Sequence, residues 1–197
     1  MKKQKNTRKP KILSVAQLGD PVLRKKAKPV KDIKDPYIQE LIDDLIETCR
    51  DADGVGIAAP QVYEPVRIFI VWSRPNDRYP DAPLTEPVAM INPRIVSRSK
   101  EKKKAYEGCL SIPGIRALVP RHIKVAIEYT DRKGKEVRKS LNHEFVARVF
   151  QHELDHLDGI VFLDRAKSSD MITEKQYKVL MKKTSVVKAK KVRINKR

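Results

Sequence analysis

The chain has 197 residues, of which 40% are hydrophobic, so its length suits a single folded domain with a sizeable core. The 43 Lys and Arg residues outnumber the 25 Asp and Glu residues, and the net charge of +18 indicates either a polyanionic partner such as RNA or a surface that serves solubility. No apolar run reaches the ~18 residues of a membrane span, so we expect no transmembrane helix.

Residues 1–10 are basic and contain no acidic side chain, so we expect a flexible N-terminal arm. No apolar core follows this arm, which argues against a secretory signal, and its Lys-rich composition is a weak match to an organelle transit peptide. The two cysteines, Cys49 and Cys109, do not indicate a disulfide scaffold. We therefore expect a cytoplasmic protein, with an organelle as the alternative.

The first regular element should be a helix over residues 37–51. Asp35 and Pro36 are a typical helix cap and first helical residue. Apolar side chains then recur at helical spacing, at Ile38, Leu41, Ile42, Leu45, Ile46 and Cys49. Cys49 lies on this face and should be a small core residue rather than a reactive thiol.

Strands dominate the middle of the chain. Residues 66–71 form an apolar, β-branched run, and residues 73–87 hold four prolines and should form a surface loop. Residues 88–96 should be a strand interrupted at Pro93, followed by an exposed charged link at 98–104. Further strands are expected around Val119, at 124–129 and at 137–141, with a turn at 131–134. Strands grouped around two helices without βαβ alternation predict an α+β fold.

A second helix should contain an H-E-x-x-H pattern inside an apolar run. Helical geometry places His152 and His156 one turn apart on one face, where two imidazoles can bind one metal ion. The carboxylate of Glu153 can then reach a water held by that ion. Asn142 is the expected N-cap and Gly159 the expected left-handed end. The alternative is a buried helix that happens to contain two histidines, but its apolar residues lie on most sides, and charges in such a helix should be paired or bound to a metal.

A catalytic metal site needs a third protein ligand, and the sequence leaves several candidates open. They are His122, His143, Cys109 and the carboxylates. Cys109 follows Gly108, which permits a close backbone approach, and would supply a soft anionic ligand, although a lone cysteine is as often a buried apolar residue. In the small-residue segment 54–61, Gln61 could direct its side-chain amide at a developing oxyanion, or it could lie on the surface beside a packed turn.

Three segments together resemble the signature motifs of the peptide deformylase family. They are Gly54-Val-Gly-Ile-Ala-Ala-Pro-Gln61, Glu107-Gly-Cys-Leu-Ser111 and Gln151-His-Glu-Leu-Asp-His-Leu157, in the family's order. The resemblance covers roughly residues 11–165 at plausible spacing. It implies an α+β fold in which strands surround a central metal-binding helix.

The resemblance also implies which residues carry the chemistry. The ligands of one divalent metal ion would be Cys109, His152 and His156. Glu153 would act as general base and acid. Gln61 and the backbone N–H of Leu110 would form the oxyanion hole. Glu107 would be a buried acid beside the site.

The same resemblance implies how a peptide would bind. An extended substrate would pair with Val55, Gly56 and the residues that follow Glu107, of which Gly108 is the first, and residues 112–117 would line the substrate cleft. An apolar pocket should select methionine. Phe145 and Val149 are its expected walls, because they lie one to two helical turns before the first metal ligand on the same face.

The expected reaction is removal of the N-formyl group from the N-terminal methionine of a newly synthesised polypeptide, with release of formate. The resemblance favours iron(II) as the metal. A thiolate with two imidazoles also accepts zinc, nickel or cobalt, so the residues themselves do not choose among these ions.

Two other classes of protein share part of the pattern. A zinc metalloprotease also uses H-E-x-x-H, but it would need a downstream His or Glu ligand, and Glu174 is the only such residue. A basic RNA- or ribosome-binding protein with a structural metal would need four closed ligands and no Glu153 or Gln61, and no aromatic RNA-recognition motif is visible. A deformylase explains more of the sequence than either.

We expect a catalytic domain over residues 11–168 and a basic C-terminal extension over 169–197. No acidic residue follows Glu174. Residues 174–181 could form a short helix, and the rest should be a flexible tail. The resemblance does not extend this far, but in some bacterial deformylases a basic C-terminal helix docks on the ribosome. This tail has the charge to bind the ribosome or its RNA, or it could be merely solvated.

Overall fold

The computed structural model describes residues 8–76 and 79–183. The helices and strands follow in the order α1 (Pro36–Asp51), β1 (Gly56–Ala58), β2 (Ile68–Val71), β3 (Val88–Arg98), β4 (Lys102–Cys109), β5 (Ile112–His122), β6 (Val125–Thr130), β7 (Glu136–Leu141), α2 (Glu144–Leu157) and β8 (Met171–Thr173). Residues 174–183 are helical, as expected for 174–181. The proposed arm before residue 8 and the tail after residue 183 lie outside the described residues.

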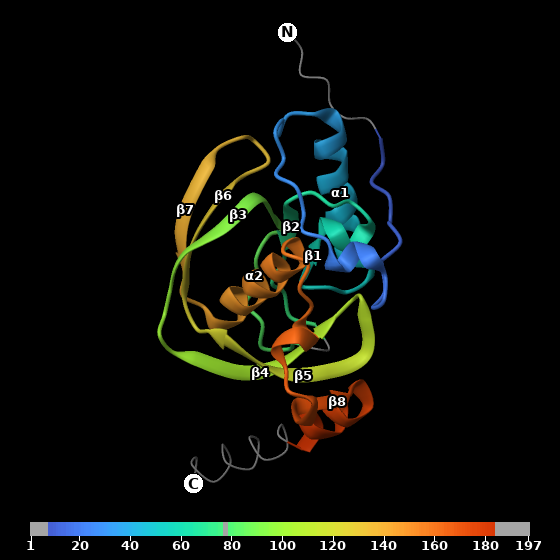
Figure 1. Cartoon of the computed structure of the whole chain (residues 1–197), viewed down its shortest axis with the longest axis vertical. Helices are drawn as coiled ribbons and strands as arrows, with labels where there is room; N and C mark the ends of the chain where they lie inside the picture. Colours follow the sequence, from blue (N-terminus) through green and yellow to red (C-terminus); the bar gives the residue numbers. More distant parts are fainter. Residues whose placement is uncertain (1–7, 77–78, 184–197) are drawn as a thin grey trace.

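Two antiparallel sheets surround α2 in this part of the chain (Figure 1). The larger sheet has the strand order β1-β2-β3-β6-β7, and the smaller one has the order β4-β5-β8. The predicted α+β fold, with the second helix at the centre of the strands, is confirmed. No helix in the described ranges is long and apolar enough to cross a bilayer.

Strand β2 explains why the two helices lie on opposite faces of the larger sheet. Its side chains alternate, so Ile68 and Ile70 join the apolar cluster of α1, whereas Phe69 and Val71 join that of α2. All four are buried. Phe69 meets Phe150 of α2 edge to face, with ring centroids 5.2 Å apart. This packing fixes the helix that carries the H-E-x-x-H pattern.

The first helix forms where its sequence predicts. The Asp35 side chain accepts a hydrogen bond from the Tyr37 N–H at 2.9 Å, and Pro36 is the first helical residue. Cys49 is fully buried on the apolar face, so its prediction as a core residue is confirmed.

The ends of α2 correct one prediction and confirm another. Asn142 is not the N-cap: that position belongs to His143, whose side chain makes no capping bond. Glu144 instead places a negative charge in the first turn, where it interacts favourably with the positive end of the helix dipole. Gly159 follows the helix with φ of 73°, and a Cβ there would lie 2.6 Å from the Arg24 carbonyl oxygen. Only glycine therefore fits this C-terminal turn.

Strands in the middle of the chain are longer than predicted. β3 is not broken at Pro93, because Asn92 adopts a positive φ and the register with β6 shifts, which forms a bulge. The exposed link at 98–104 is also wrong in part, since Lys102 already belongs to β4. β4 and β5 form a long hairpin that leads to Cys109. β8, which pairs with β5, has no counterpart among the predicted strands.

Candidate functional site

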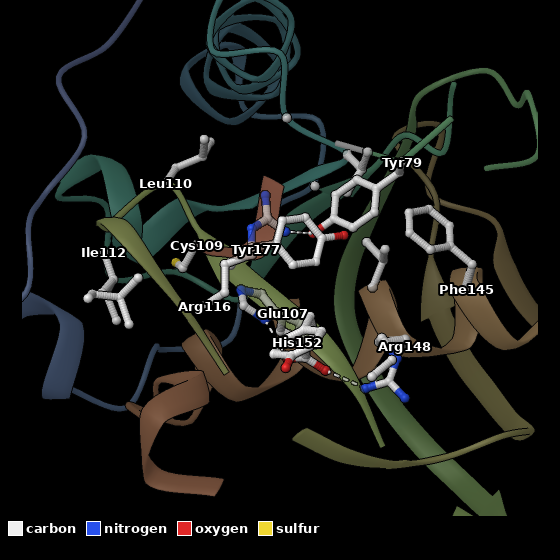
Figure 2. A pocket seen from close by; sticks show the side chains of 18 of the residues that line it. Tyr79, Glu107, Cys109, Leu110, Ile112, Arg116, Phe145, Arg148, His152 and Tyr177 are labelled. Carbon is white, nitrogen blue, oxygen red and sulfur yellow. Dashed lines mark hydrogen bonds and ion pairs between the residues drawn. The ribbon is translucent and has the colours of Figure 1, made fainter. Parts of the chain in front are cut away.

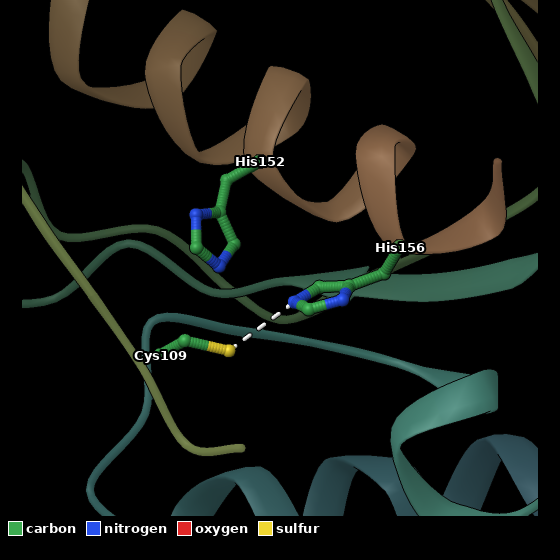
Figure 3. A group of neighbouring side chains, drawn as sticks. All are labelled: Cys109, His152 and His156. Carbon is green, nitrogen blue, oxygen red and sulfur yellow. Dashed lines mark hydrogen bonds between the residues drawn. The ribbon is translucent and has the colours of Figure 1, made fainter. Parts of the chain in front are cut away.

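The candidate metal centre joins β4 to α2 (Figure 3). Cys109 ends β4, and His152 and His156 project toward it from successive turns of α2. One ligand atom from each lies within 4.8 Å of the others, and the described residues contain no second cluster of this kind. The Cys109 Sγ is 3.2 Å from the Nε2 of His156. Of the candidate third ligands, the fold brings Cys109 to the two histidines and leaves His122 and His143 outside the cluster.

The chemistry of this cluster fits a divalent metal ion. The Nδ1–H of His152 donates to a Glu107 oxygen at 3.0 Å, which leaves the other ring nitrogen directed toward Cys109 and His156. Burial lowers the pKa of His152, but Cys109 and Glu107 outweigh this and raise it well above its usual value. Burial and the neighbouring His152 hold the pKa of His156 well below its usual value. One thiol and two imidazoles thus face one another, a donor set that suits a divalent metal ion.

Glu153 lies buried beside this cluster with one carboxylate oxygen unused. Its Oε2 is inaccessible to solvent and has no hydrogen-bond partner. Burial is the main reason that the pKa of Glu153 is raised to about 7. The absence of a side chain at Gly56 leaves the space for this carboxylate, since a Cβ there would lie 2.5 Å from Oε1. The group can both accept and release a proton near neutral pH.

Gln61 is held with its amide facing the same centre. The side chain is buried, and its Oε1 accepts a hydrogen bond from the Ala58 N–H at 2.9 Å. Its Nε2 donates to the Ser111 hydroxyl at 3.1 Å and lies 3.4 Å from the Cys109 Sγ. Leu110 follows Cys109 in the turn between β4 and β5, so its backbone N–H lies next to the cluster. These donors suit a developing negative charge on oxygen.

A buried ion network supports the centre from behind. Glu107 accepts two hydrogen bonds from Arg121 and one from Arg148, all at 2.9 Å. Arg121 also donates to Asp155 of α2 at 2.5 Å. Burial raises the pKa of Glu107, but Arg121 and His152 outweigh it and hold the pKa far below the usual range. The Glu107 carboxylate therefore orients His152. Neither arginine was predicted from the sequence, although Arg148 is a charged residue within an apolar helix and was a signal.

A cleft of about 820 Å³ opens onto the centre (Figure 2). The residues predicted to bind substrate all line it: Val55, Gly56, Glu107, Gly108, Phe145 and Val149. Arg116 also lines it, within the segment 112–117 that was expected to do so, whereas Tyr79, Glu174 and Tyr177 line it without having been predicted. They come from distant segments and share no local motif, so the sequence alone gave no sign that they meet.

Comparisons with known proteins agree with this arrangement. The family model described as polypeptide deformylase matches residues 12–171. Peptide deformylase 2 of Nostoc sp. is 56% identical over 177 residues, which span 89% of this chain and 98% of that protein. Peptide deformylase 2 of Shewanella oneidensis is 44% identical over 80% of this chain and 86% of its own.

Solved structures give the same result. The Met-Ala-Ser-bound class I type b peptide deformylase from Acinetobacter baumannii superposes with a TM-score of 0.76 at 43% identity, over 78% of this chain and 98% of that one. The peptide deformylase from Thermotoga maritima gives a TM-score of 0.70 at 40% identity, over 79% and 98% of the two chains. The similarity thus extends over nearly the whole of each solved chain.

Proposed function

The chain belongs to the polypeptide deformylase family and is a metal-dependent hydrolase that removes the N-formyl group from the N-terminal methionine of newly synthesised polypeptides, and we propose that the Cys109, His152 and His156 cluster is where it does so. One observation above all supports this location. The buried Glu153 carboxylate has an unpartnered oxygen beside the three potential ligands.

Cys109, His152 and His156 would hold the ion. When bound, it would acidify a water molecule and polarise the formyl carbonyl group. We propose iron(II) as the native ion because the family resemblance favours it, and zinc, nickel or cobalt as substitutes because one thiolate and two imidazoles accommodate all four. Metal analysis of protein purified without oxygen would identify the ion, and a stoichiometric content of another metal would contradict iron.

The neighbouring side chains supply proton transfer and charge stabilisation. Glu153 takes a proton from the attacking water and later delivers it to the amine that leaves. Its carboxylate is buried and lines the cleft that the substrate enters. The Gln61 amide and the Leu110 N–H donate hydrogen bonds to the carbonyl oxygen as it gains negative charge. The hydrogen bonds that Gln61 accepts from the Ala58 N–H and donates to the Ser111 hydroxyl hold this amide in place before substrate arrives.

The cleft provides the place for an extended peptide. The backbone at Val55, Gly56 and Gly108 lines it and can pair with a substrate strand. Phe145 and Val149 form an apolar wall for the methionine side chain. The peptide in the Acinetobacter baumannii structure supports this proposal, because that protein binds Met-Ala-Ser and shares the fold.

The location and partners of the enzyme form a further part of the proposal. We place catalysis in residues 11–168 and assign the cytoplasm, where formylated chains emerge from bacterial ribosomes. The basic extension 169–197 would contact ribosomal RNA, since it has no acidic residue after Glu174. Co-sedimentation of the full chain with ribosomes at increasing salt tests this contact, and absence of binding at low salt would contradict it.

Release of formate from formyl-Met-Ala-Ser tests the proposed site. The protein is purified without oxygen and loaded with metal, and wild type is compared with Glu153→Ala. We expect rapid release by wild type and a loss of about 10²- to 10⁴-fold in the variant, with metal still bound. An exposed glutamate on β7 provides the control, and Glu136→Ala should behave as wild type.

The same assay separates the alternatives. Formate release that persists in Glu153→Ala would remove the general-base role. No formate from metal-loaded wild type would overturn the proposed function. Cleavage of internal peptide bonds instead would indicate a metalloprotease.

A further inference from the structure

The outer wall of the cleft is built by the C-terminal segment, residues 171–183. β8 pairs antiparallel with β5, which sets Ile172 opposite Arg116. Glu174 follows β8 directly, so this pairing brings its carboxylate to the Arg116 side chain. The helix that starts at Glu174 brings Tyr177 back to the cleft one turn later.

The guanidinium of Arg116 is buried in this wall and its charge is paired. Glu174 accepts hydrogen bonds from it at 2.5 and 3.3 Å. The Arg116 side chain is 3% exposed and that of Glu174 is 27% exposed. The guanidinium also donates to the Tyr79 hydroxyl at 3.1 Å and lies 4.3 Å from the centre of the Tyr177 ring (Figure 2). A buried cation needs such partners, and Glu174 is the charged one.

This pair stands where a substrate would pass. A Cβ built on Gly108 would lie 3.3 Å from the Arg116 guanidinium carbon, so the charge rests against the backbone just before Cys109. Arg116 and Glu174 both line the cleft that contains the metal cluster. A peptide chain laid along Gly108 would therefore meet this pair with the side chains that follow its methionine.

We propose that Glu174 determines the charge preference of the enzyme for the residues that follow methionine. With its carboxylate on Arg116, the pair carries no net charge, so it neither attracts nor repels an acidic or basic side chain of the substrate. Such neutrality suits an enzyme whose substrates share only their first residue. This inference rests on the proposed function, and it adds a residue from outside the three sequence motifs.

The test compares formate release from amidated formyl peptides that carry Asp, Gln or Lys at the second or third position. In wild type, kcat/KM for the Asp and Lys peptides should agree within about threefold. Glu174→Gln leaves the guanidinium without its carboxylate. It should raise the Asp-to-Lys ratio, which is kcat/KM for the Asp peptide divided by kcat/KM for the Lys peptide, about tenfold, as expected for one charge-assisted hydrogen bond. Glu136→Gln makes the same charge change on an exposed part of β7, and its ratio should stay at the wild-type value.

A second variant should shift the charge preference in the opposite direction. Arg116→Gln leaves the Glu174 carboxylate unpaired and should lower the Asp-to-Lys ratio about tenfold, so it decides the matter even if Glu174→Gln fails to fold. An unchanged ratio in the folded variants, with normal turnover of formyl-Met-Ala-Ser by wild type, overturns the inference alone. No turnover of any formyl peptide by metal-loaded wild type would overturn the proposed function and this inference together.

Discussion

The Gln61 side chain shows how three short contacts prepare one amide for catalysis. Replacement by Leu keeps the volume but removes the donor, so kcat should fall about 10²- to 10³-fold with little change in KM. Steady-state kinetics on formyl-Met-Ala-Ser measures this. Ser111→Ala removes only a partner of the amide and should cost less than about tenfold. A rise in KM at unchanged kcat would mean that Gln61 binds substrate instead.

Gly56 matters because the absence of its side chain leaves room for the Glu153 carboxylate. In Gly56→Ala the new methyl group would displace the flexible end of Glu153, so the free energy of unfolding should change by less than about 1 kcal/mol while kcat falls at least tenfold. Gly54→Ala is the matched control, because its Cβ would contact Cys49 and Leu110 at 3.2–3.3 Å but not Glu153. Its activity should stay closer to wild type. Equal losses in the two variants would contradict this explanation.

Between elements, the buried ion network fastens α2 to the β4–β5 hairpin. Arg121→Met leaves Glu107 and Asp155 short of a partner, so the free energy of unfolding should fall by about 3–5 kcal/mol. Arg94→Met breaks an exposed pair with Glu128 and should cost less than about 1 kcal/mol. Urea denaturation of both variants measures the difference. Similar small losses in both would show that solvent reaches the Glu107 network.

The elements also show what sequence patterns predict well. α1 has a cap, a proline at its first position and a regular apolar face, and all three signals are local, so its range is correct within one residue. The bulge at Asn92 and the start of β4 at Lys102 depend on register with a neighbouring strand. Those contacts are distant in sequence and the strand surfaces are charged, so periodicity alone could not place them.

For the molecule as a whole, an ion bound by Cys109, His152 and His156 would cross-link β4 to α2. Chelation should lower the midpoint of thermal unfolding by about 5–10 °C and abolish formate release, because an ion that binds only the folded state stabilises it. Added metal should restore both. Cys109→Ala lacks one ligand, so its midpoint should respond little to chelator or metal. An unchanged midpoint after verified metal loss would contradict this link between binding and stability.

The candidate site, like the secondary structure, contains residues that the sequence predicts and residues that only the tertiary structure brings together. Glu153 lies in the H-E-x-x-H pattern, whose spacing points to its role, whereas the roles of Cys109 and Gln61 stayed open until their short motifs were matched to the family. Tyr79, Arg116 and Tyr177 meet only because β8 pairs with β5 and because Tyr79, from the loop before β3, contacts Arg116. Their assembly depends on tertiary structure, and the sequence holds no short pattern that announces it.

The outer wall of the cleft has a consequence for inhibitor design. Glu174, Tyr177 and Met181 line the cleft but lie beyond the segment 12–171 that matches the family model. A compound anchored only at the metal cluster would contact features common to deformylases. A compound that also stacks on the Tyr177 ring and bonds to Glu174 would recognise a surface outside that shared segment, and it would discriminate between this enzyme and deformylases whose chains end differently.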